Sequence, residues 1–396
     1  MAGPLHGIRI IDISAVISGP MACQVLADQG AEVIKVEPLG IGDITRLGGF
    51  RVGTVSAMFA AANRGKRSLA IDLSKPAGIE AIHKLAATAD VFVQNFRPGA
   101  VERMGIGPDD LRKINPNLIY VSISGFGPTG PYSKWRVYDP IVQAITGVIS
   151  IQQSRDIPIP DLIRTLVCDK STAFTAAQAI TAALFARLRG DAAGQHLVIP
   201  MLDASLYWLW PDALMGHSLT GPNMPGPLLY QIYRLQPTAD GHLVYIAIGQ
   251  GDWEGLCTAL GHPQWWAEPR FHDVNERIKP ENFEAVGELL NAAFLEMTTE
   301  DAINALHEHE VPCAPILSFD DMFEDAQVLH NEAVHTWEHP TAGPIRQAKP
   351  GVRWETTVHE TVWACDELGQ SSASVLRELG YGDEDLAALR SDGVIA

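Results

Sequence analysis

Positive charge is scarce in this sequence. Lysine and arginine together number 29, against 47 aspartates and glutamates, and the formal net charge is −18. General binding to DNA or RNA requires a broad basic surface that neutralises phosphates. The composition argues against a nucleic-acid-binding protein, and it makes any compact basic cluster in so acidic a chain more informative.

Closely spaced cysteines are also absent. The five cysteines are scattered and form no C-x-x-C pair, which favours reduced thiols over a disulfide framework or a zinc site. The "HEHE" stretch at 307–310 places its histidines two residues apart, whereas a helical zinc site needs a spacing of four. The sequence therefore predicts no metal site.

Long apolar runs are missing. None approaches the roughly 18 residues of a membrane span. The N-terminal "MAGPLHGIRIIDIS" lacks the basic segment and long apolar stretch of a signal peptide. We expect a cytoplasmic protein that does not bind membranes.

Two common nucleotide-binding motifs are absent as well. The segment after the first predicted strand, "SAVISGPM", carries one glycine, Gly19, where a dinucleotide-binding turn needs G-x-G-x-x-G. No G-x-x-x-x-G-K-[ST] motif occurs either. NAD or FAD bound in the usual way is disfavoured, and ATP bound by a P-loop is not supported.

What the sequence does contain is a regular alternation of strand and helix patterns. Such alternation predicts an α/β fold with a parallel sheet wound in βαβ units. A Pro- and Gly-rich stretch at 220–228 is the best candidate for a linker, and a second region with its own strand and helices follows it. The predicted strands of the first region are 8–13, 31–37, 67–73, 90–96 and 117–127, and its first helices are 20–30 and 77–89.

Basic residues gather in "NRGKRS" at 63–68, which contains Arg64, Lys66 and Arg67. Arg97, Arg103 and Arg136 follow later strands. Ligands of open α/β sheets collect at the carboxyl ends of the strands. Cations placed there would suit a multiply phosphorylated nucleotide such as coenzyme A.

The stretch "LVCDKSTAF" at 166–174 precedes a long alanine-rich helical pattern. By itself, Asp169 is best interpreted as the N-cap of that helix. Cys168 is a rival nucleophile, because a thiol at a helix N-terminus can have a lowered pKa. A small buried side chain is nevertheless the more ordinary role for this cysteine.

Five segments closely resemble the family III CoA-transferases, a family that includes formyl-CoA and carnitine CoA-transferases (the CaiB/BaiF family) together with related α-methylacyl-CoA racemases. The resemblance runs from "GIRIIDIS" to the last residues. The segments are "DVFVQNFRPGAVERMGI", "NPNLIYVSISGFGPTGP", "YDPIVQAITG", "CDKSTAFTAAQAITAALFARLRG" and "LRELGYGDEDLAALRSDGVI".

The resemblance implies specific site residues. The catalytic nucleophile of the transferases aligns with Asp169. Two glycines around Gln250, Gly249 and Gly251, take the place of a longer glycine run in an active-site loop, which disfavours formyl-CoA and oxalate as substrates. The implied CoA contacts are Ile17, Ile71, Asp72, Leu73, Ser74, Asn95, Phe96, Arg97, Arg103, Arg136, Val137, Tyr138 and the adjoining Asp139.

The implied reaction moves CoA from an acyl-CoA donor to a free carboxylic acid through an aspartyl anhydride and an aspartyl-CoA thioester. An aspartate of ordinary pKa is ionised at neutral pH and can attack a thioester without an added base. Coenzyme A and its thioesters are then substrates, and no permanently bound cofactor is expected.

Three alternatives stay open. An acyl-CoA racemase or isomerase would need a second acid–base, and its histidine position is occupied by Tyr138, a poor proton shuttle at neutral pH. A non-catalytic CoA-binding protein would not need Asp169. A thioesterase would depend on Cys168.

The resemblance also implies the architecture. A large Rossmann-like CoA-binding domain is expected from 1–220, completed by a linker and C-terminal part at 326–396. A smaller α+β domain at 225–325 lies between them in the sequence. Two chains are expected to form an interlocked homodimer, with acyl-CoA and a small carboxylic acid as the other partners.

Overall fold

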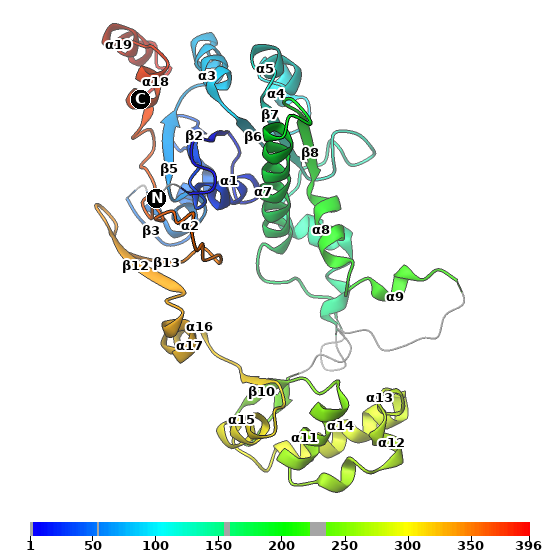
Figure 1. Ribbon diagram of the computed structural model, residues 1–396. Coiled ribbons are helices and arrows are strands. Elements are labelled where there is room, and N and C mark those ends of the chain that lie inside the picture. The colour runs from blue at the N-terminus through cyan, green and yellow to red at the C-terminus, as the bar shows by residue number, and fades with distance from the viewer. Residues whose placement is uncertain (1–2, 54, 154–158, 222–234) are drawn as a thin grey trace. The chain divides into compact units, whose positions relative to one another are not determined.

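The computed structural model describes residues 3–53, 55–153, 159–221 and 235–396. Most of the predicted 220–228 linker lies outside these ranges. The chain divides into two compact units (Figure 1). Met1–Leu209 and Glu332–Ala396 form unit 1, and Trp210–Asn331 form unit 2. Each unit is described by itself.

Unit 1 is built on a six-stranded parallel sheet, which confirms the predicted α/β fold. The strand order is β5-β2-β1-β6-β7-β8. After β1 the chain proceeds outward to β5, and then continues at β6 on the other side of β1. Such a reversal places the ligand crevice of an open α/β sheet at the carboxyl ends of the two central strands, here β1 and β6. The strands are β1 (Arg9–Asp12), β2 (Glu32–Glu37), β5 (Lys66–Ala70), β6 (Val91–Gln94), β7 (Ile119–Ser124) and β8 (His196–Pro200).

Helices cover both faces of this sheet, so its central strands are apolar on both sides. Along β6, Val91 and Val93 belong to one core cluster and Phe92 to the other. The first cluster contains residues of α1 (Ser18–Ala27), α6 (Asp139–Thr146), α7 (Val167–Leu188) and α8 (Met201–Leu209). The second contains residues of α3 (Pro76–Thr88), α4 (Ala100–Arg103), α5 (Pro108–Ile114), α18 (Ser372–Glu378) and α19 (Asp383–Ser391).

The end of the chain completes unit 1. Ile395 forms an isolated bridge with Ile71, and the Asp72 N–H donates to the Val394 carbonyl at 2.8 Å. The last residues therefore fix the segment that follows β5. The remaining elements of unit 1 are η1 (Ile44–Leu47), β3 (Arg51–Val52), β4 (Val55–Ser56), α2 (Ala57–Asn63), η2 (Ser150–Gln152), β12 (Val334–His339) and β13 (Gly343–Ala348).

Unit 2 has its own core, in which Leu243, Trp253 and Phe294 are buried. Its sheet is antiparallel, in the order β11-β10-β9. The elements are α9 (Met215–Ser218), β9 (Gln236–Pro237), β10 (His242–Tyr245), α11 (Gln250–Ala259), η3 (Pro263–Trp265), α12 (Pro269–His272), α13 (Val274–Arg277), α14 (Pro280–Phe294), α15 (Thr299–Glu308), β11 (Cys313–Pro315), α16 (Phe319–Glu324) and α17 (Ala326–His330).

The start of α7 differs from the sequence prediction. The helix begins at Val167, and its N-cap residue is Leu166. Asp169 lies inside the first turn and is not the N-cap. The physical reason is that another carboxylate, supplied by α6, accepts the hydrogen bond of this helix start.

Candidate functional site

Four of the predicted segments follow carboxyl ends of strands in the parallel sheet. Ile17 follows β1, residues 71–74 follow β5, residues 95–97 follow β6, and residues 136–138 end the longer connection from β7. Carboxyl ends of parallel strands meet at one edge of a sheet, where ligands of this fold class bind. The fold therefore gathers these segments on one side of unit 1.

The loops after β1 and β6 are fastened to each other. The Asn95 side chain accepts a hydrogen bond from the Ala15 N–H at 2.9 Å and donates to the Ala15 carbonyl at 2.7 Å. Ile17 is buried next to this contact and precedes α1. Asn95 thus has a structural partner in the loop before α1.

Asp169 is a buried carboxylate in this region, with 7% of the residue exposed. Burial raises the pKa of its side chain to about 6, and the negative charge of Asp139 adds to this effect. Hydrogen bonding from the side chain and the backbone of Ser18, at the start of α1, partly opposes the increase in pKa. The ordinary pKa expected from the sequence was wrong, because a single sequence does not show burial.

Asp139 fixes the first turn of α7 from α6. It is 1% exposed, and one of its oxygens accepts the Asp169 N–H at 2.8 Å. The other accepts from the Gln143 side chain at 2.6 Å. Gln143 also donates to the Ile163 and Thr165 carbonyls at 3.1 and 3.2 Å.

Sequence reasoning gave Gln143 no role and placed Asp139 only among the CoA contacts. Their spacing of four residues in "DPIVQ" is the signal that could have identified them. Residues four apart share one face of a helix and can hydrogen-bond to each other.

Cys168 is unsuited to be the nucleophile. It is 2% exposed within the first core cluster. Burial, together with charge repulsion from Asp139 and Asp169, raises the pKa of its thiol to about 11, and hydrogen bonding with Ser205 partly opposes this increase. Because only the thiolate is nucleophilic, the structure favours a packing role for this side chain.

A pocket of about 440 Å³ joins two of the predicted CoA-binding segments. Leu73 and Ser74, after β5, line it together with Arg103 of α4. Lys75 also lines it, and the Lys75 ammonium donates to the Gly393 carbonyl at 2.9 Å. The full lining is Leu73, Ser74, Lys75, Pro76, Ile79, Glu80, His83, Arg103 and Met104. Cationic side chains around such a pocket are suited to the phosphates of a nucleotide.

The basic cluster at 64–67 does not form part of a nucleotide site, and this interpretation of the sequence was wrong. Lys66 is buried and pairs with Asp12 at 2.8 Å. Arg64 pairs with Asp28 at 2.7 Å. The cluster also precedes or begins β5, at the amino end of the strand, so it lies away from the carboxyl edge. Arg67 pairs with Glu32 and Glu378.

The remaining predicted residues of unit 1 are mostly accessible. Phe96, Arg97 and Arg136 are exposed, and Val137 is partly buried. Tyr138 is 65% exposed and is the N-cap residue of α6, directly before Asp139. These side chains can reach a ligand, whereas Ile71 is buried against the end of the chain.

Gly249, Gln250 and Gly251 lie in unit 2 and are exposed. The Gly249 N–H donates to the Asp252 carboxylate at 2.8 Å, just before α11. The Gln250 side chain accepts from Arg277 at 3.4 Å.

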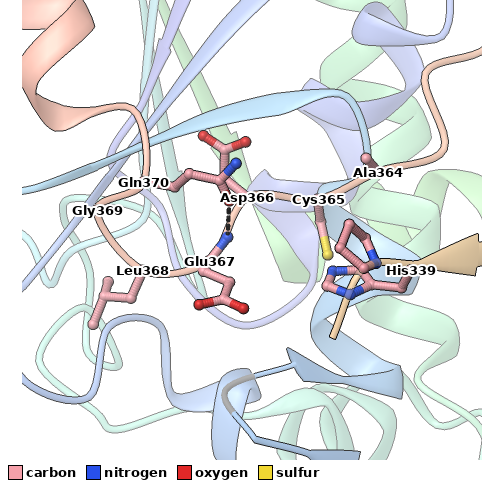
Figure 2. Close-up of a pocket in the computed structure, with 9 residues that line it drawn as sticks. His339, Ala364, Cys365, Asp366, Glu367, Leu368, Gly369 and Gln370 are labelled. Atoms are coloured by element: carbon pink, nitrogen blue, oxygen red, sulfur yellow. Dashed lines mark hydrogen bonds between the residues drawn. The ribbon is translucent and has the colours of Figure 1, made fainter. Parts of the chain in front are cut away.

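A different pocket, of about 450 Å³, lies in the C-terminal part of unit 1 (Figure 2). Cys365, Asp366 and Glu367 line it, and His339 faces them from the end of β12. None of the predicted site residues belongs to it. Burial raises the pKa of the Cys365 thiol to about 11.

Metal ligands do not gather in the described part of the chain. No group of three or more histidine, cysteine, aspartate or glutamate side chains there is arranged to hold a metal ion. No helix in the described ranges is long and apolar enough to cross a membrane.

The sequence matches the family model described as CoA-transferase family III over residues 5–372. It is 35% identical to succinyl-CoA:glutarate CoA-transferase of Mus musculus, over 99% of this chain and 90% of that protein. It is 30% identical to formyl-CoA:oxalate CoA-transferase of Escherichia coli O139:H28, over the full length of both.

Solved structures agree with the sequence comparisons. A CaiB/BaiF family protein from Brucella suis has a TM-score of 0.80 at 29% identity, covering 96% of this chain and all of that chain. The protein Rv3272 from Mycobacterium tuberculosis has a TM-score of 0.82 at 29% identity, covering 94% of this chain and 99% of that one. The chain therefore belongs to CoA-transferase family III and is an enzyme of that family.

Proposed function

We propose that this enzyme transfers CoA from an acyl-CoA to a free carboxylic acid, with Asp169 as the covalent nucleophile. The observation that carries the proposal is a buried carboxylate in the first turn of α7, next to the start of α1, with its pKa raised to about 6. At neutral pH this group is mainly an anion. It is also more basic than an exposed aspartate, and nucleophilicity increases with basicity.

The reaction proceeds in four balanced steps. The Asp169 carboxylate attacks the donor thioester, forming an acyl-aspartyl anhydride and releasing CoA thiolate. The thiolate attacks the aspartyl carbonyl, giving an aspartyl-CoA thioester and the free donor acid. The acceptor carboxylate then attacks that thioester, forming a second anhydride and CoA thiolate. The thiolate finally attacks the acceptor acyl carbon, which yields the new acyl-CoA and regenerates the aspartate.

The chain offers residues for holding CoA. We propose that the pocket at 73–104 holds the nucleotide end, with Arg103 and Lys75 near its phosphates. The exposed Arg97, Arg136 and Tyr138 would contact the rest of the molecule. Binding energy from these remote contacts can lower the barrier at the thioester.

Oxygen labelling tests the nucleophile directly. Acceptor acid labelled with ¹⁸O in both carboxylate oxygens is incubated with the enzyme and a donor thioester. The steps above leave one acceptor oxygen in the Asp169 carboxylate after each turnover, which peptide mass spectrometry detects. The first panel pairs succinyl-CoA or formyl-CoA with glutarate or oxalate, the substrates named for the relatives.

Asp169→Asn supplies the negative control, and Asp109→Asn is its matched partner. Asp109 is an exposed aspartate in the first turn of α5. We expect turnover and labelling to disappear in the first variant and to persist in the second. CoA transfer without label in Asp169 would contradict the anhydride route.

A racemase is the second candidate. Tyr138, exposed beside the buried Asp139, stands where that branch carries a histidine, which disfavours it. Solvent deuterium appearing at the α-carbon of a branched acyl-CoA, with no label in Asp169, would favour racemisation.

We further propose that two chains form an interlocked homodimer. An apolar stripe along α7 supports this proposal, with Phe174, Phe185 and Leu188 all more than half exposed within unit 1. Tyr207 and Trp208 of α8 are exposed to a similar or greater extent. Large apolar side chains exposed on two adjoining helices favour an interface at this surface.

A further inference from the structure

The loop between β1 and α1 contains an unfavourable backbone conformation. Val16 has a φ of 73°, and among the described residues only Glu310 and Glu332 are other non-glycine residues with positive φ. Left-handed backbone is costly for a β-branched residue. It persists only where surrounding contacts hold it, and such positions cluster at functional sites.

Three side chains hold the backbone of this loop at successive residues. The Lys35 ammonium, from β2, donates to the Ser14 carbonyl. Asn95 binds both backbone groups of Ala15. The Asp43 carboxylate accepts the Val16 N–H, with both oxygens 3.3 Å from the nitrogen.

Asp43 is itself held firmly. It is 3% exposed, and one of its oxygens lies 3.1 Å from the Lys35 ammonium. The other accepts from the Thr45 N–H and hydroxyl at 2.9 and 2.8 Å. The Asp43 N–H donates to Glu37 at 2.9 Å. The carboxylate is thus buried, paired with a cation and fixed in position.

The direction of the chain after Val16 decides where α1 begins. Ile17 precedes the helix, Ser18 is its first residue, and α1 and α7 share the first core cluster. Ser18 is also the residue that counters the rise in the pKa of Asp169. The loop also folds tightly against the helix start, because a Cβ on Gly19 would lie 2.2 Å from the Ser14 hydroxyl. A change at Val16 would therefore displace the groups that Ser18 presents.

We infer that Asp43 is a positioning residue for the acyl-transfer reaction, which it serves by holding Val16 in the left-handed conformation that aims Ser18 at Asp169. The inference rests on the proposed role of Asp169 as nucleophile. Among the described residues no hydrogen bond or ion pair joins Asp43 to Asp169, and Asp43 therefore acts through the loop.

The Asp43→Asn variant tests this role. Its amide keeps the size of the carboxylate but replaces one accepting oxygen with an N–H donor. With one accepting oxygen fewer, the variant holds the Val16 N–H less firmly. We expect Val16 to shift toward negative φ and Ser18 to stabilise the Asp169 anion less. Asp139 and Cys168, the titratable groups that face Asp169, are unchanged in the variant.

The readout is single-turnover acyl loading of Asp169, trapped with hydroxylamine and followed from pH 5 to pH 8. We expect Asp43→Asn to slow loading about tenfold, less than the roughly hundredfold loss caused by removing a hydrogen-bond donor outright. We also expect the acidic limb of the variant's pH–rate profile, where loading falls as Asp169 is protonated, to move to higher pH. The reason is that a less stabilised Asp169 anion has a higher pKa. A merely structural role would reduce the amount of active enzyme without moving the limb.

A double-mutant cycle with Val16→Gly separates the loop from other effects of Asp43. Glycine adopts positive φ without strain, so the loop then depends less on the carboxylate. We expect the loss caused by Asp43→Asn to be several-fold smaller when the chain also carries Val16→Gly. Thr45→Val, which removes one donor to Asp43, provides a milder variant if Asp43→Asn does not fold, and its limb should move in the same direction.

The outcomes distinguish failure of the proposed nucleophile from failure of the positioning role alone. Wild-type enzyme that turns over without loading Asp169 would overturn the proposed nucleophile and this inference with it. Wild-type loading at Asp169, combined with an unmoved acidic limb in the folded Asp43 or Thr45 variant, would overturn the positioning role alone. The positioning role would also be overturned if Asp43→Asn reduced the loading rate equally with and without the Val16→Gly substitution.

Discussion

At the scale of single residues, opposing effects set the pKa of the Asp169 carboxyl group. Burial and the nearby Asp139 anion raise its pKa, while Ser18 lowers it, and the outcome is about 6. A carboxylate with such a pKa is protonated in mild acid and ionised at neutral pH. The fold thereby increases the basicity of the proposed nucleophile while leaving it mainly ionised at neutral pH.

This balance predicts the pH dependence of the first chemical step. Loading of Asp169 should fall as the pH drops through about 6, because the protonated acid is not nucleophilic. Asp139→Asn removes the negative charge that raises the pKa of Asp169, so its acidic limb should move to lower pH. Rapid-quench loading from about pH 4.5 to pH 8 measures both limbs, and a limb that stays in place in the variant would contradict this account.

At the scale of elements, Gln143 joins helix α6 to the segment that leads into α7. Its amide donates to Asp139 and to the Ile163 and Thr165 carbonyls, and its oxygen accepts the Ile163 N–H at 3.0 Å. One buried side chain therefore fixes the position of the turn that carries the proposed nucleophile.

Removing this connection should affect stability and activity together. Gln143→Ala leaves backbone groups at 163 and 165 without their partners, and we expect a loss of about 2–3 kcal/mol in the free energy of unfolding. The rate of Asp169 loading should fall as well, because Asp139 loses a donor. Urea denaturation and single-turnover kinetics measure the two effects. Lys113→Ala, at an exposed position on α5, should change neither.

At the scale of the whole molecule, residues far apart in the sequence complete unit 1. Glu37 binds Arg46 through two contacts of 2.7 Å, and Arg46 also donates to the Asp366 carbonyl at 3.1 Å. The C-terminal part of the chain is thus connected through Glu37 to Asp43 and the loop before α1. Truncation of this part would therefore affect the site as well as the fold.

The proposed homodimer gives the prediction at this scale. The exposed stripe on α7 should lie in the subunit interface, so Leu188→Glu, which places a charge at a side chain 84% exposed in the single chain, should weaken association. Light scattering after size-exclusion chromatography measures the mass. We expect a dimer for the wild type and for the conservative variant Phe185→Tyr, and a shift toward monomer for Leu188→Glu. A wild-type monomer would contradict the proposal.

The sequence by itself determined the local structure and the family. The buried strands of the first hundred residues are short apolar runs separated by helices with apolar periodicity, so their parallel arrangement was predictable. The motif around Asp169 identified the proposed nucleophile because it belongs to one continuous segment. Local patterns of this kind depend on neighbours along the chain.

Tertiary structure decided the charges and contacts of the site. Lys66 appeared to be available to a phosphate, but folding buries it against Asp12, which is 54 residues away in sequence. The pKa of Asp169 depends on α1 and α6, and the left-handed Val16 depends on Asp43, which approaches from the loop after a different strand. Burial and through-space charge depend on distances that only the folded chain defines, and for that reason no pattern in a single sequence shows them.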